Sequence, residues 1–226
     1  FAALAAEAAL RYPEVKRFQV WNEMKGFYDS STNAWNSAAY TDMYNQVHHA
    51  IKAVRPDAMV GGPYAPLDLW SDAGTMSHPS DVRGPWGVVD QRPLDVIEYW
   101  LAHNEGADFV TLDGWIKTRD RGLLIDPFEA TDVYRVVTEW LQARTDLPIW
   151  WSEVHVADPS WNLEFQDAVT TAALLKMAQA GVDTALLWSP QEDALGCAGC
   201  LWSDPAHGPV VATPLSETVA VWSACA

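Results

Sequence analysis

Short apolar runs alternate along this chain with longer segments that have helical spacing. Five apolar runs lie at residues 18–23, 58–62, 108–113, 148–153 and 183–188. Apolar spacing suited to helices is found at residues 1–12, 38–54, 94–104, 131–144, 163–180 and 214–223. Runs that are apolar on both faces are typical of parallel strands covered by helices. The pattern therefore predicts an α/β fold built from five successive β/α units.

The connections between these elements are long after the strands and short before them. The long stretches are residues 24–37, 65–91, 116–129 and 189–207. This asymmetry is typical of a (β/α)8 TIM-type barrel, whose site lies at the carboxyl ends of its strands. A full barrel has eight units. We therefore expect residues 1–226 to be a single barrel domain with only the last five β/α units, three amino-terminal units being absent from this sequence.

The composition is that of a globular protein, with 49% hydrophobic and 19% charged residues. A net charge of -16 argues against nucleic acids and anionic membranes as partners, because both need a basic face. The chain has no apolar run of about 18 residues, the length that spans a bilayer. Thirteen tryptophans are unusual, and their flat faces suit sugar rings, although a Trp-rich core accounts for most of them.

Three cysteines are too few for a disulfide scaffold. Cys197 and Cys200 lie in a glycine-rich loop, without the second pair that a zinc site needs. Cys197 and Cys200 could either form a disulfide within the loop or remain as two free thiols. A disulfide would indicate an extracytoplasmic protein. The compartment is otherwise unassigned, with secretion slightly favoured.

Similar polar residues end two of the predicted strands. Trp21-Asn22-Glu23 ends the first, and Trp151-Ser152-Glu153 ends the fourth. Carboxyl ends of strands in one barrel face the same opening, so both carboxyl groups would lie there. Glycoside hydrolysis needs such a pair, about 5–5.5 Å apart for retention and about 6.5–9.5 Å apart for inversion. The alternative is two unrelated carboxylates at strand ends.

These stretches resemble the clan A glycoside hydrolases. Residues 18–23 are similar to their strand-4 motif, Trp150-Trp151-Ser152-Glu153 to their strand-7 motif, and Leu187-Trp188 to the end of their strand 8. The sequence Val-Trp-Asn-Glu, together with the Gly-Gly-Pro that ends the next strand, most resembles the motifs of glycoside hydrolase family 39 and its relatives. The resemblance covers strands 4 to 8, which is nearly the whole chain.

The resemblance implies a retaining hydrolase in which Glu23 is the acid/base and Glu153 the nucleophile. Asn22 would bind the sugar 2-hydroxyl, and Trp188 would stack on the ring at the cleavage point. Met24 stands where the family usually has proline. The third strand ends in Asp113-Gly114-Trp115 without the usual His-x-Tyr, so contacts to the nucleophile are unassigned.

Four further residues complete the candidate site. Trp115 and Tyr64 are expected to line the walls of the substrate cleft, or else to pack in the core. Asp113 would hold a sugar hydroxyl or only cap a turn. His155 would contact substrate, orient a carboxylate, or be a satisfied loop histidine.

We therefore expect a glycosidase that acts on a β-linked glycan or glycoside and uses neither a cofactor nor a metal. Two other functions are open. One is a sugar-binding barrel without catalysis. The other is a metal-dependent barrel hydrolase, which would need His and Asp at several strand ends.

Overall fold

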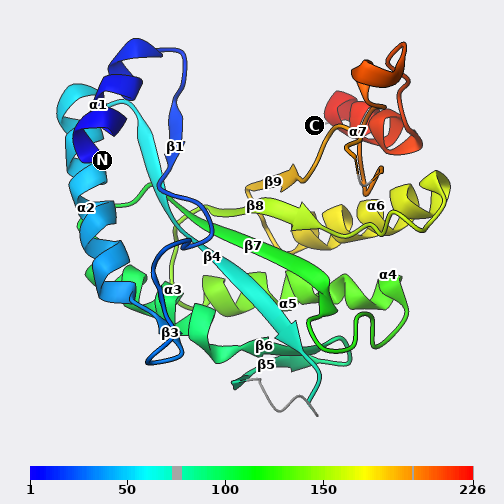
Figure 1. Ribbon diagram of the computed structural model, residues 1–226, viewed down its shortest axis with the longest axis horizontal. Coiled ribbons are helices and arrows are strands. Elements are labelled where there is room, and N and C mark those ends of the chain that lie inside the picture. The colour runs from blue at the N-terminus through cyan, green and yellow to red at the C-terminus, as the bar shows by residue number, and fades with distance from the viewer. Residues whose placement is uncertain (73–77, 195, 226) are drawn as a thin grey trace.

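A computed structural model describes residues 1–72, 78–194 and 196–225. Its main sheet contains five parallel strands in chain order, which confirms the predicted α/β architecture (Figure 1). They are β1 (Arg17–Gln19), β4 (Met59–Trp70), β7 (Phe109–Thr118), β8 (Ile149–His155) and β9 (Thr184–Leu187). Each strand lies beside the next in sequence, as successive right-handed β/α crossovers of a barrel require.

Helices connect the parallel strands and cover the sheet. They are α1 (Ala2–Arg11), α2 (Ser37–Val54), α3 (Gln91–His103), α4 (Pro127–Ala130), α5 (Asp132–Gln142), α6 (Leu163–Gln179) and α7 (Pro214–Cys225), with a 3-10 turn η1 (Pro205–His207) before the last. Figure 1 shows α1 and α2 beside β1 and β4 at one side of the sheet, and α6 and α7 near β9 at the other. Large side chains such as Trp100, Tyr134 and Met177 point from these helices into the core. Among the described residues, no helix is both long and apolar enough to cross a membrane.

The prediction of a loop over residues 65–91 is wrong for most of its length. Strand β4 runs on to Trp70, and a hairpin of β5 (Pro79–Gly84) and β6 (Gly87–Asp90) pairs antiparallel with its end. In β4, buried Ala65, Leu67 and Leu69 alternate with half-buried Pro66, Asp68 and Trp70. This period-two pattern marks a strand, although the prolines and polar residues obscure it. Residues 73–77 of the predicted loop lie outside the described residues.

Other boundaries also differ from prediction. Strand β7 extends past the expected end at residue 113 to Thr118, whereas β1 stops at Gln19, four residues before the expected end. The predicted loop over 24–37 contains a small hairpin of β2 (Tyr28–Asp29) and β3 (Ala34–Trp35). Helix α2 begins at Ser37, one residue before the predicted start, and Asn36 caps it, its Oδ1 accepting from the Ala39 amide at 3.0 Å.

The glycine-rich loop after β9 contains a disulfide between Cys197 and Cys200. Of the two alternatives for these cysteines, the structure therefore favours the loop disulfide over two free thiols. Residue 195 of the predicted 189–207 loop lies outside the described residues.

Candidate active site

Glu23 is presented by a tight turn immediately after β1. Trp21, Glu23 and Met24 all have positive φ, at 74°, 45° and 55°, a conformation that costs energy for residues other than glycine. Met24 is fully buried and fixes the turn in the core, and the Trp21 indole donates to the carbonyl of Lys25 at 2.7 Å. Strained backbone of this kind often marks a functional site.

Tyr64 lies on an irregularity in β4 and reaches Glu153 on β8. The register between β4 and β7 shifts between Pro63 and Ala65, and Tyr64 has a φ of 57°. Its side chain is buried, and its hydroxyl donates a hydrogen bond to Oε2 of Glu153. Burial and the adjacent carboxylate raise the pKa of Tyr64 above its usual value, so the phenol keeps its proton.

Glu153 is buried, with both carboxyl oxygens in contact with other side chains. Oε1 lies 3.2 Å from Nε2 of His155, two residues further along β8. The His155 ring stacks on Trp115 of β7, with ring centroids 4.9 Å apart. Burial lowers the pKa of His155, and the negative charge of Glu153 opposes this. Glu153 is therefore held from two sides by groups from β4 and β8.

Asp113 lies between the two glutamates. It is opposite Glu153 in the register of β7 and β8, and only 3% of it is exposed. Its carboxyl group is in hydrogen-bonding contact with that of Glu23. Two carboxyl groups can form this hydrogen bond only when one of them carries a proton. Burial, the contact with Glu23 and the charge of Glu153 all raise the pKa of Asp113, so Asp113 is the protonated partner.

Glu23 has a more polar environment. Burial raises its pKa, but hydrogen bonds from Lys25 and Asp113, together with the positive charge of Lys25, lower it by more. Lys25 forms an ion pair with Oε2 of Glu23, and Nδ2 of Asn22 donates to the same oxygen at 3.3 Å. Without substrate, these contacts therefore favour the ionised form of Glu23, whereas burial favours the protonated form of Asp113.

A cavity of about 250 Å³ opens beside this cluster. Trp115 and His155 line one side of it and Trp188, which follows β9, lines another. Trp188 is 58% exposed, so its ring face is accessible to a ligand. A cavity with aromatic faces and a few polar groups suits a sugar ring.

Among the predicted site residues, Trp115, His155 and Trp188 line the cavity, and His155 joins it to a cluster that contains Glu23, Asn22, Tyr64, Asp113 and Glu153. Glu23, Asp113, Glu153 and His155 interact electrostatically with one another, and Tyr64 contacts Glu153 directly. Sequence reasoning missed Lys25, because a surface lysine two residues after a glutamate carries no distinctive pattern. It also left the contact to Glu153 unassigned; the tyrosine that makes it comes from a different strand than the expected His-x-Tyr.

One set of residues could also hold a metal ion. Asp113, Glu153 and His155 each offer a ligand atom, and these atoms lie within 4.8 Å of one another. Both oxygens of Glu153 already face donors, on Tyr64 and His155. Oδ1 of Asp113 is buried and, within the described ranges, has no hydrogen-bond partner. This oxygen suits either a protonated carboxyl group or a ligand atom.

Comparisons with known proteins bear on the fold. No protein-family model and no curated protein matches the sequence. Among solved structures, a glycoside hydrolase family 39 (GH39) enzyme from Xanthomonas axonopodis pv. citri aligns with 99% of this chain at 20% identity and a TM-score of 0.62, over 44% of its own length. A monomeric β-xylosidase from Caulobacter crescentus aligns with 95% of this chain at 20% identity and a TM-score of 0.58, over 43% of its length.

An exo-β-1,4-mannosidase from Opitutaceae bacterium strain TAV5 aligns with 99% of this chain at 18% identity and a TM-score of 0.63. The present chain covers 39% of that protein, so it spans less than half the length of each of these three structures. Identities this low establish the fold alone. The chain therefore has the fold of part of a TIM barrel, and its structural neighbours are GH39 and other clan A glycoside hydrolases.

Proposed function

We propose that this protein is a retaining glycoside hydrolase that cleaves β-linked glycans or glycosides. The observation that carries the proposal is the gathering of Glu23, Asp113 and Glu153, which come from the turn after β1, from β7 and from β8. The aromatic cavity beside them supports a sugar as the ligand. The solved neighbours include a β-xylosidase and an exo-β-1,4-mannosidase, which is consistent with a β-linked substrate.

In this mechanism Glu153 is the nucleophile. Its buried carboxylate attacks the anomeric carbon, and the bond from that carbon to the leaving oxygen breaks. The hydrogen bond from Tyr64 and the contact with His155 hold the attacking carboxylate in one orientation. Water then displaces Glu153 from the glycosyl-enzyme, which releases the sugar with its configuration retained.

Glu23 is the acid/base in the same scheme. It gives a proton to the leaving oxygen in the first step and takes one from the attacking water in the second. Because Glu23 and Asp113 share a hydrogen bond, the proton held on Asp113 lies next to the group that must deliver it. Asn22, bound to Glu23, and Trp188 on the cavity wall would position the sugar.

Asp113 contacts Glu23 and sits opposite Glu153 in the register of β7 and β8. Retention requires the carboxyl groups of Glu23 and Glu153 to lie about 5–5.5 Å apart. We also propose that residues 1–226 belong to one catalytic barrel domain, and that the Cys197–Cys200 disulfide reflects an oxidising, extracytoplasmic compartment.

The test is covalent trapping. Aryl β-glycosides of xylose, mannose and glucose are first screened for turnover, and the 2-deoxy-2-fluoro analogue of the accepted sugar is then incubated with the protein. We expect a mass increase of one fluoroglycosyl group on the peptide that contains Glu153. Turnover without such an adduct, and with an inverted product by NMR, would contradict the proposed mechanism. Sugar binding without turnover would favour the non-catalytic alternative.

A metal-dependent hydrolase is the second candidate, because Asp113, Glu153 and His155 have ligand spacing. In that case turnover would be lost on dialysis against a chelator and restored by a divalent ion. Under the main proposal, chelation leaves the rate unchanged.

A further inference from the structure

The two central strands continue well beyond the catalytic carboxyl groups. On β7, Asp113 is followed on the same face by Trp115 and Lys117, because side chains alternate along a strand. On β4, beyond the irregularity at Tyr64, Pro66 and Asp68 lie on the side opposite the buried Leu67 and Leu69. The pairing of β4 with β7 persists to Leu69 and Thr118. At about 3.3 Å per residue, Asp68 lies roughly 13 Å along the strand from Tyr64.

A second cavity, of about 240 Å³, lies at this extension. Its lining includes Asp68, Trp115, Lys117 and Arg119. Trp115 and Lys117 also line the cavity that contains His155 and Trp188. The two cavities therefore share Lys117 and Trp115, whose side chain is exposed.

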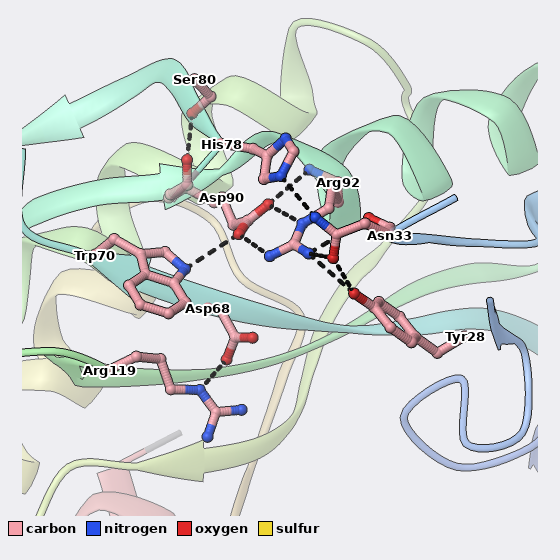
Figure 2. Close-up of polar contacts among 10 residues, drawn as sticks. Tyr28, Asn33, Asp68, Trp70, His78, Ser80, Asp90, Arg92 and Arg119 are labelled. Atoms are coloured by element: carbon pink, nitrogen blue, oxygen red, sulfur yellow. Dashed lines mark hydrogen bonds and ion pairs between the residues drawn. The ribbon is translucent and has the colours of Figure 1, made fainter. Parts of the chain in front are cut away.

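The polar groups in the second cavity suit sugar hydroxyls. Nε of Arg119 donates to Oδ1 of Asp68 at 2.6 Å (Figure 2). Within residues 1–72, 78–194 and 196–225, the two Nη groups of Arg119 and Oδ2 of Asp68 make no hydrogen bond. This pair therefore offers donors and an acceptor side by side, an arrangement that matches two adjacent hydroxyls. Because the charges of the pair cancel, it favours neutral sugars.

The turn that carries Arg119 is fixed to the end of β4. The amide of Arg119 donates to the carbonyl of Leu69 at 2.8 Å, and Thr118 closes the turn on Gly122 through its amide and hydroxyl. Asp120 accepts from both the amide and the hydroxyl of Ser71. A site held this firmly requires little ordering when a ligand binds.

The strand wall is also fixed beyond Asp68. Figure 2 shows the indole of Trp70 directed at Asp90, to which it donates at 3.1 Å. Asp90 is in turn paired with Arg92, which contacts Tyr28 and Asn33 of the small hairpin. The end of β4 is thus held in place on both of its sides.

We propose that Asp68 and Arg119, with the outer face of Trp115, form a distal subsite that holds a further neutral sugar of a β-linked oligosaccharide. The proposal rests on the proposed glycosidase function and adds that the substrate is a chain longer than a disaccharide. Because Trp115 and Lys117 line both this cavity and the one that contains His155, a single sugar chain can reach from one cavity to the other.

The experiment compares oligosaccharide and aryl-glycoside turnover in the whole protein. The aryl glycoside that it accepts is paired with the β-1,4-linked tetrasaccharide of the same sugar, and kcat/KM is measured for both. We expect Arg119→Ala to lower the ratio of kcat/KM for the tetrasaccharide to kcat/KM for the aryl glycoside about tenfold. This factor corresponds to the loss of one charge-assisted hydrogen bond to the sugar. Arg119→Lys, which keeps the charge but not the planar fork, should lose part of that factor.

Arg135→Ala is the matched control, because Nε of Arg135 on α5 donates to Asp132 as Nε of Arg119 donates to Asp68, and Arg135 lines neither cavity. It should leave the ratio unchanged. An unchanged ratio in Arg119→Ala, or an equal fall in Arg135→Ala, would overturn the distal subsite.

A failure of the proposed function would be recognised separately. If no glycoside is turned over, tetrasaccharide binding is measured by titration calorimetry. Weaker binding to Arg119→Ala than to Arg135→Ala would then support the distal subsite without catalysis. No binding to the unaltered protein, or equal binding to both variants, would overturn it.

Discussion

The hydroxyl of Tyr64 on β4 donates to the carboxylate of Glu153 on β8, although β7 lies between these two strands. The bulge around Tyr64 moves its side chain out of the regular alternation of β4. This contact joins two residues 89 positions apart and fixes one oxygen of the proposed nucleophile.

Tyr64→Phe should therefore lower kcat/KM by about ten- to a hundredfold, the value of a hydrogen bond to a charged group. The melting temperature should change little, because the ring still fills its buried position. Tyr44→Phe is the control: its buried hydroxyl donates to the carbonyl of Gly106 at 3.0 Å, away from the site. Tyr44→Phe should cost about 1 kcal/mol of unfolding free energy and leave kcat/KM unchanged. If Tyr64→Phe instead left kcat/KM unchanged while Tyr44→Phe lowered it, Tyr64 would have no part in the site.

Glu153→Gln should reduce turnover of the aryl glycoside by about a thousandfold or more, because an amide cannot displace the leaving group. Circular dichroism and thermal melting should show an intact fold. Glu139→Gln is the control, since Glu139 lies on α5, where it pairs with Arg135. Undiminished activity in Glu153→Gln would exclude it as nucleophile.

Glu23→Ala should hydrolyse unactivated glycosides very slowly, because no acid remains to protonate the leaving oxygen. With an activated aryl glycoside, whose leaving group needs no proton, added azide should accelerate turnover. Azide then replaces the water that Glu23 would have deprotonated, and a glycosyl azide forms. The product is identified by mass spectrometry. Absence of rescue over a range of azide concentrations would count against the acid/base role.

Asp113→Asn should change how stability depends on pH. Burial and the adjacent carboxyl groups raise the folded-state pKa of Asp113 above its unfolded value of about 3.9. Its contribution is therefore fully present below the unfolded pKa and is lost as the pH rises toward the folded pKa. Asparagine does not titrate, and its amide can still donate to Glu23. Urea unfolding should show the variant gaining stability relative to the unaltered protein as the pH rises above about 4. A difference independent of pH would show that Asp113 is ionised in the folded protein.

Asp90→Ala should destabilise the fold strongly. Asp90 is 1% exposed and accepts from Arg92 and from the Trp70 indole (Figure 2). Its removal leaves the largely buried Arg92 without its ion-pair partner, which costs about 3–5 kcal/mol. Lys16→Ala breaks an exposed ion pair with Asp57 and should cost less than about 1 kcal/mol. Chemical denaturation of both variants measures the difference, and equal costs would show that burial does not strengthen the Asp90–Arg92 pair.

The sequence predicted the order of strands and helices because that order depends on local patterns. The parallel strands were recognisable as apolar runs, and α6 begins at the predicted residue because Leu163 follows a capping asparagine. The extension of β4 was missed, since Pro66 and Asp68 are unusual in a strand and weaken its alternating pattern.

By itself, the sequence determined an α/β chain with Glu23 and Glu153 at strand ends and Trp188 after the last strand. These are local facts about which residue follows which apolar run. Only the tertiary structure decided that Tyr64 holds Glu153 and that Asp113 lies between the two glutamates. Those contacts depend on a bulge and on register across three strands, which no local pattern encodes. The protonation of Asp113 follows from its burial beside two other carboxyl groups, and burial is a property of the whole fold.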